Sequence, residues 1–146
     1  MKTMSLKICG IVQGVGFRPF VANLARAHGI RGTVANRGSY VEIFAAGTAE
    51  DLRIFQGELL EKAPERSSIL SIHVTEVKGA KHFTGFSIIE SERDTGAVFV
   101  SPDIAICENC QKELFTPSNR RYLHPFINCT ACGPRLTILD AMPYDR

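Results

Sequence analysis

A short segment near the beginning of the chain combines two glycines with an arginine, in an order suited to binding an anion. The segment consists of Gln13, Gly14, Val15, Gly16, Phe17 and Arg18. Alternating apolar residues at 6–12 predict a strand before it, and residues 19–25 predict the first turns of a helix after it. A glycine-rich loop in this position lets backbone N–H groups converge on an anion, and the helix N-terminus adds partial positive charge. Because a guanidinium also grips phosphate oxygens, Arg18 makes the segment a candidate phosphoryl-binding loop.

The familiar phosphate-binding motifs do not fit this segment. It lacks the Gly-Lys-Ser/Thr ending of a P-loop. Pro19 takes the place of the third glycine in the dinucleotide-binding fingerprint. On the glycines alone, a tight turn with Arg18 as a surface charge is the alternative.

Two pairs of cysteines form the second candidate site. They are Cys107 and Cys110, followed by Cys129 and Cys132. Two Cys-x2-Cys knuckles at this separation predict a tetrahedral Zn²⁺ site. Disulfides and unrelated buried thiols are the alternatives, but no signal peptide indicates an oxidising compartment. His124 is expected to be a surface or packing residue rather than a substitute ligand, and Cys9 a structural thiol.

The rest of the pattern predicts the elements that position the loop. Apolar residues of 20–28 share one helical face, and Gly29 is expected to end that helix. Thr48 is a candidate N-cap for a second helix, which Pro64 ends. Strands are expected at residues 32–36, 40–46, 69–77 and 83–90, with a turn at residues 36–39. The order β-α-β-β-α-β predicts an α+β, ferredoxin-like sandwich.

The loop and the first predicted hairpin together resemble the acylphosphatase family. Residues 10–18 match its signature Gly-x-Val-Gln-Gly-Val-x-Phe-Arg, and residues 32–36 match its second signature, Gly-x-Val-x-Asn. The resemblance implies that the loop and Arg18 bind phosphate and that Asn36 orients the attacking water. Taken alone, Asn36 would be expected only to form a turn. One departure is Tyr40, where the family usually has glycine in a turn that is one residue longer.

A wider pattern extends the resemblance over essentially the whole chain. Residues 102–110, 120–122, 125–135 and 142–146 resemble the N-terminal part of the carbamoyltransferase family of NiFe-hydrogenase maturation. That family implies carbamoyl phosphate as substrate, cleaved to carbamate and phosphate. The carbamate would pass to adenylate-forming and transfer domains, and then to a carbamoyl-acceptor maturation protein. The family continues with two further knuckles, so whether these four cysteines complete one zinc site stays open.

Composition agrees with two small modules and excludes other classes of protein. The 146 residues divide into an acylphosphatase-like domain at 1–91 and a zinc-finger segment at 92–146. No apolar run approaches the roughly 18 residues of a membrane span. A net charge of +2, without a basic stripe, gives no reason to expect nucleic acid. We therefore expect a cytoplasmic hydrolase acting on carbamoyl phosphate. The alternatives are a generic acylphosphatase with a zinc docking module, or a non-catalytic interaction fragment.

Overall fold

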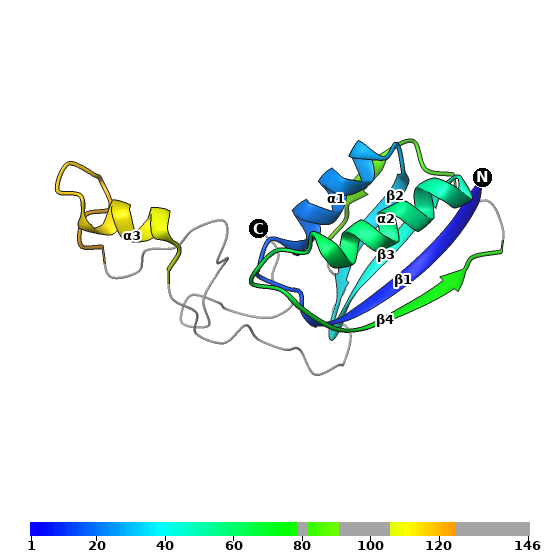
Figure 1. Ribbon diagram of the computed structural model, residues 1–146, viewed down its shortest axis with the longest axis horizontal. Coiled ribbons are helices and arrows are strands. Elements are labelled where there is room, and N and C mark those ends of the chain that lie inside the picture. The colour runs from blue at the N-terminus through cyan, green and yellow to red at the C-terminus, as the bar shows by residue number, and fades with distance from the viewer. Residues whose placement is uncertain (79–81, 91–105, 125–146) are drawn as a thin grey trace.

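The protein is a two-layer sandwich with two helices on one face of a five-stranded sheet, seen in a computed structural model (Figure 1). The structure describes residues 1–78, 82–90 and 106–124. The strands are β1 (Lys2–Ile11), β2 (Arg31–Arg37), β3 (Tyr40–Gly47), β4 (Ser68–Glu76) and β5 (Phe86–Ile88). The helices of the sandwich are α1 (Phe17–Ala27) and α2 (Ala49–Glu61). A third helix, α3 (Glu108–Phe115), lies to one side of the sandwich.

The sheet topology confirms the predicted α+β, ferredoxin-like arrangement. The strand order is β4-β1-β3-β2-β5. β1 is antiparallel to both β3 and β4, and β2 is antiparallel to β3. The first six elements follow the order β-α-β-β-α-β, and β5 then adds an edge strand parallel to β2.

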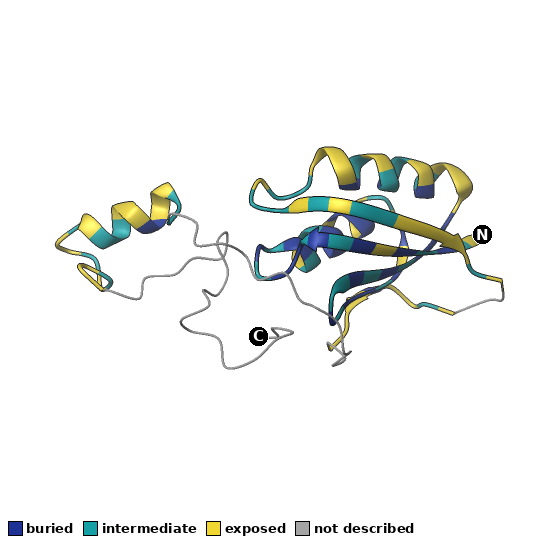
Figure 2. Ribbon diagram, turned by 90° about the horizontal axis from the view of Figure 1, so that it is seen from below, coloured by how far each residue is buried: buried dark blue, intermediate teal, exposed yellow. Residues whose placement is uncertain are grey.

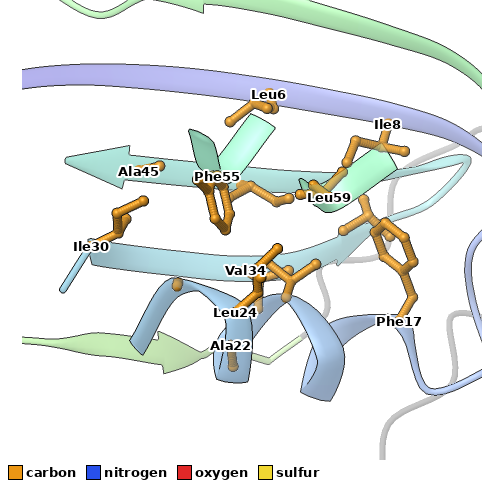
Figure 3. Close-up of a cluster of buried hydrophobic side chains, with 14 of the residues drawn as sticks. Leu6, Ile8, Phe17, Ala22, Leu24, Ile30, Val34, Ala45, Phe55 and Leu59 are labelled. Carbon is orange, nitrogen blue, oxygen red and sulfur yellow. The ribbon is translucent and has the colours of Figure 1, made fainter. Parts of the chain in front are cut away.

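The core lies between the helices and one face of the sheet, because each central strand alternates buried and partly exposed residues. Leu6 and Ile8 of β1 meet Phe55 and Leu59 of α2 there (Figure 3). Phe17 extends from the beginning of α1 into the same cluster. The outer face of α2 is exposed (Figure 2), and α1 likewise has exposed residues on its outer side. The buried cluster therefore fixes where α1 begins, and with it the position of the preceding loop.

Polar contacts at the helix ends agree with the expected boundaries. Thr48 caps α2, because its Oγ1 accepts a hydrogen bond of 3.1 Å from the Asp51 backbone N–H. At the other end, the Glu58 carboxylate of α2 lies 3.0 Å from His28 Nε2, at the C-cap of α1, and 2.9 Å from Lys62 Nζ. Hydrogen bonds from His28 and then Lys62 hold the pKa of the Glu58 carboxyl below its ordinary value.

Several element boundaries differ from the sequence-based prediction. β1 begins at Lys2 rather than at residue 6, because β3 continues to Gly47 and offers it a partner there. The last strand is limited to Phe86–Ile88, the three residues that pair with β2. α1 begins at Phe17, two residues before Pro19. The sequence does not predict helix α3, and the expected boundary between the two modules, at residues 91 and 92, lies outside the described residues.

The described helices carry no candidate membrane span, since none combines the length and the apolar character that a crossing needs.

Candidate active site

The loop between β1 and α1 takes its shape from its two glycines. Gly14 and Gly16 have φ values of 73° and 78°, a left-handed conformation that costs glycine little. Gln13, Val15 and Phe17 are buried, whereas Gly14, Gly16 and Arg18 are only partly buried. Every second residue of this loop is therefore anchored in the protein interior, and the peptide groups of the two glycines lie next to solvent.

The beginning of α1 has the electrostatic character of an anion site. Gly16 is the N-cap residue, it provides no side-chain cap, and the first turn contains no acidic residue. Helix geometry gives the N–H groups of Gly16 and Phe17 no acceptor within the helix. Pro19 fits in this first turn because it has no N–H to satisfy. Arg18 in the same turn adds a full positive charge beside the helix N-terminus.

Strand topology brings Asn36 to the same end of the sheet as the loop. In the β1–β3 ladder, Cys9 near the end of β1 pairs with Tyr40 at the beginning of β3. Tyr40 also pairs with Arg37, the last residue of β2. The loop that follows β1 therefore begins beside the strand end that carries Asn36.

Asn36 is the second-to-last residue of strand β2 and does not lie in the hairpin turn, which corrects the predicted turn at residues 36–39. It pairs with Val41, and the turn itself is formed by Gly38 and Ser39. Gly38 has a φ of 50°, as the first central residue of a type II′ turn requires. Because directly paired residues share a face, Asn36 projects with the buried Val41 toward the helices, where its side chain is 1% exposed.

A hydrogen bond between side chain and backbone joins the loop to this hairpin. Gln13 Nε2 donates to the Gly38 carbonyl oxygen at 2.8 Å, across 25 positions in the sequence. The structure thus brings the two predicted signature segments together at one site. The sequence predicts Gln13 only as part of the phosphate loop, and its contact with Gly38 is visible only in the fold.

The first glycine of each signature has a structural role in strand packing. An ideal Cβ on Gly10 would lie 2.0 Å from the Ser68 carbonyl oxygen, and one on Gly32 would lie 1.8 Å from the Phe44 carbonyl oxygen. A side chain would have to push the backbone apart at either position. These two glycines therefore allow a neighbouring strand to approach closely at the first position of each signature.

The first cysteine pair lies at the beginning of α3. Cys107 is the N-cap residue and Cys110 lies one turn later, so both thiols are on one side of the helix. Cys110 is 2% exposed. This arrangement fits one knuckle of a zinc site. Cys129 and Cys132 lie outside the described residues, and within residues 1–78, 82–90 and 106–124 no three potential ligands gather into a metal site.

Comparison with known proteins matches two family models to separate parts of the chain. The acylphosphatase family model matches residues 4–88, and the HypF finger model matches residues 106–139. The acylphosphatase of Staphylococcus haemolyticus is 37% identical over 89 residues, which is 61% of this chain and 100% of that protein. The chain belongs to the acylphosphatase family. Among solved structures, the acylphosphatase from Bacillus subtilis is 36% identical with a TM-score of 0.57, covering 61% of this chain and 99% of that one.

The similarity beyond the acylphosphatase domain is to carbamoyltransferases. The probable carbamoyltransferase HypF of Methanocaldococcus jannaschii is 47% identical over 143 residues, 97% of this chain. A crystal structure of full-length HypF in a phosphate- and nucleotide-bound form is 46% identical with a TM-score of 0.86, covering 99% of this chain. The chain spans 19% of the length of each of these two relatives. Both signatures and the cysteine segment thus resemble the carbamoyltransferase family, as the sequence indicated.

Proposed function

We propose that this acylphosphatase domain hydrolyses acyl phosphates and that its natural substrate is carbamoyl phosphate. The observation that carries the proposal is the Gln13–Gly38 hydrogen bond, which holds an anion-binding loop against the strand end carrying Asn36. The choice of carbamoyl phosphate rests on the similarity to carbamoyltransferases along almost the whole chain.

In the proposed reaction, the water oxygen forms a bond to phosphorus while the bond from phosphorus to the carbamate oxygen breaks. The products are carbamate and inorganic phosphate, and the proton of the water leaves with phosphate or solvent. Since an acyl phosphate is already activated, the protein must mainly bind charge and align the water. This demand agrees with a site that is rich in N–H donors.

The residues divide this work between two elements. The loop amides of Gln13 to Phe17 and the Arg18 guanidinium would hold the phosphoryl oxygens, at a helix N-terminus that favours negative charge. The Asn36 side-chain oxygen would accept a hydrogen bond from the attacking water and direct it at phosphorus. Burial of Asn36 to 1% exposure would keep this geometry fixed.

The proposal extends to the partners of the reaction. In the full-length carbamoyltransferase, carbamate would pass to the adenylate-forming and transfer domains and then to a carbamoyl-acceptor maturation protein in the cytoplasm. The finger segment would bind Zn²⁺ through Cys107, Cys110, Cys129 and Cys132, and would have a structural role outside the hydrolytic step. A generic acylphosphatase is the second candidate, favoured by the end-to-end match with the Staphylococcus haemolyticus enzyme.

Substrate preference distinguishes the two candidates. Phosphate release by the purified chain is measured with carbamoyl phosphate and with acetyl phosphate. The acyl carbon carries an amino group in the first compound and a methyl group in the second. We expect turnover of both, with the higher kcat/KM for carbamoyl phosphate. A clear preference for acetyl phosphate would favour the generic enzyme, and the absence of turnover with either would contradict the proposal.

Metal removal tests the proposed zinc site. Structural zinc contributes folding free energy directly, so chelation should make residues 97–146 sensitive to protease while the acylphosphatase domain stays resistant. We expect one Zn²⁺ per chain, lost in the Cys110→Ser variant and retained in Cys9→Ser, which replaces a thiol on β1. A metal-free protein with an equally resistant tail would overturn the four-cysteine site.

A further inference from the structure

Two buried polar side chains stand out among the described residues of the core. Gln13 is 5% exposed and Asn36 is 1% exposed, whereas the other fully buried side chains of the described core are apolar. Burying a polar side chain costs free energy unless it is hydrogen-bonded, so such positions call for a reason. Both lie at the proposed active site, one on each of the two segments that form it.

The Gln13 side chain acts as a bridge between those segments. A carbonyl oxygen can only accept, so the 2.8 Å contact with Gly38 fixes the amide with Nε2 toward the turn. The other amide atom, Oε1, is buried and has no hydrogen-bond partner within the described residues. Within the described residues, the bond to Gly38 is therefore the one hydrogen bond that the Gln13 side chain makes.

Backbone pairing does not provide the same link. β1 pairs with β3 and β4 but not directly with β2, so the ladders link the β1 end to the β2 end through Tyr40 of β3 and not to the loop itself. Within the described residues, no backbone hydrogen bond joins residues 12–16 to residues 36–39. On the opposite face of the hairpin, Arg37 Nε donates to Glu42 Oε2 at 3.1 Å, a bond that braces the hairpin internally.

We propose that the Gln13 side chain is a positioning residue for hydrolysis. Its amide holds the Gly38 turn against the phosphate loop, and this keeps Asn36 aligned with the phosphorus that the loop binds. The inference rests on the proposed function and adds a task for the signature glutamine that differs from binding phosphate. Gln13 acts on kcat through Asn36.

The test replaces Gln13 by methionine, which has a similar length but no N–H donor. We expect kcat for acyl-phosphate hydrolysis to fall about 10-fold, because small misalignment of a positioned group is costly in rate. The affinity for inorganic phosphate should change by less than about twofold, since the loop amides remain in place. Gln13→Asn, which stays polar but is one methylene too short, should behave in the same way and serves if the methionine variant does not fold.

A double-mutant cycle shows whether Gln13 works through Asn36. In an Asn36→Ala background, adding Gln13→Met should lower kcat by less than about twofold, because the group to be positioned is already absent. Fully multiplicative losses would show that the two residues act independently and would overturn the inference.

Arg26→Met is the matched structural control. Arg26 Nη2 also bridges two segments, donating to the Phe86 carbonyl oxygen at 3.2 Å, but it does so away from the loop. This variant should lose stability while retaining parental kcat. If the parent protein shows no hydrolysis, the proposed function fails. If the parent is active and Gln13→Met retains its kcat, the positioning role fails while the proposed function stands.

Discussion

Replacing Arg18 by alanine is expected to lower kcat/KM for acyl-phosphate hydrolysis by about 10³-fold or more. Removing one preorganised donor to a developing charge costs about 10²–10³-fold, and Arg18 supplies a full charge as well. The fold should stay intact, since Arg18 is only partly buried in the first turn of α1. Phosphate release by the purified variant, beside its thermal unfolding curve, measures both effects.

Two controls separate the charge of Arg18 from its shape and its position. Arg18→Lys should recover only part of the activity, because an ammonium keeps the charge but lacks the planar fork. Arg26→Ala removes a guanidinium from the last turn of the same helix and should leave turnover at the parental level. Unchanged turnover in Arg18→Ala would remove Arg18 from the site.

The second large effect is expected for Asn36→Ala, with kcat reduced about 10²-fold because the attacking water loses its orienting acceptor. Affinity for inorganic phosphate should change little, since the loop and Arg18 still bind the anion. NMR titration with phosphate, which follows the amide signals of residues 13–18, gives this affinity separately from kcat.

Asn23→Ala is the control for this substitution. Asn23 is an exposed asparagine on α1, so its replacement should alter neither kcat nor phosphate affinity. A loss of phosphate affinity in Asn36→Ala with kcat preserved would contradict the assignment of Asn36 to the water.

The sandwich was predictable because its patterns are local and strong. Alternating apolar residues mark β1 and β3, and Thr48 three residues before Asp51 marks the beginning of α2. Strand ends that are set by pairing with a distant segment of the chain could not be predicted from the local sequence. The extension of β1 to Lys2 follows from pairing with Gly47, and the three residues of β5 follow from pairing with β2. The sequence does not predict α3, because the Cys-x2-Cys spacing indicates metal ligands without also indicating that Cys107 caps a helix and Cys110 lies in its first turn.

The candidate site was predictable as a set of residues but not as a geometry. The two signatures place Arg18 and Asn36 in the sequence, yet neither signature indicates that Gln13 reaches Gly38 across 25 positions. Likewise, glycine at positions 10 and 32 is explained only by the carbonyl oxygens that approach each of them from a neighbouring strand. Contacts of this kind arise when strands from distant parts of the chain meet.

The most direct test of the central claim is the phosphate titration in the parent protein, followed by NMR. If residues 13–18 form the phosphoryl site, the amide signals of Gly14, Val15, Gly16 and Phe17 should shift together along one binding curve, and the shifts should disappear in Arg18→Ala. Shifts confined to other parts of the chain, or loop shifts that persist unchanged in Arg18→Ala, would contradict the account.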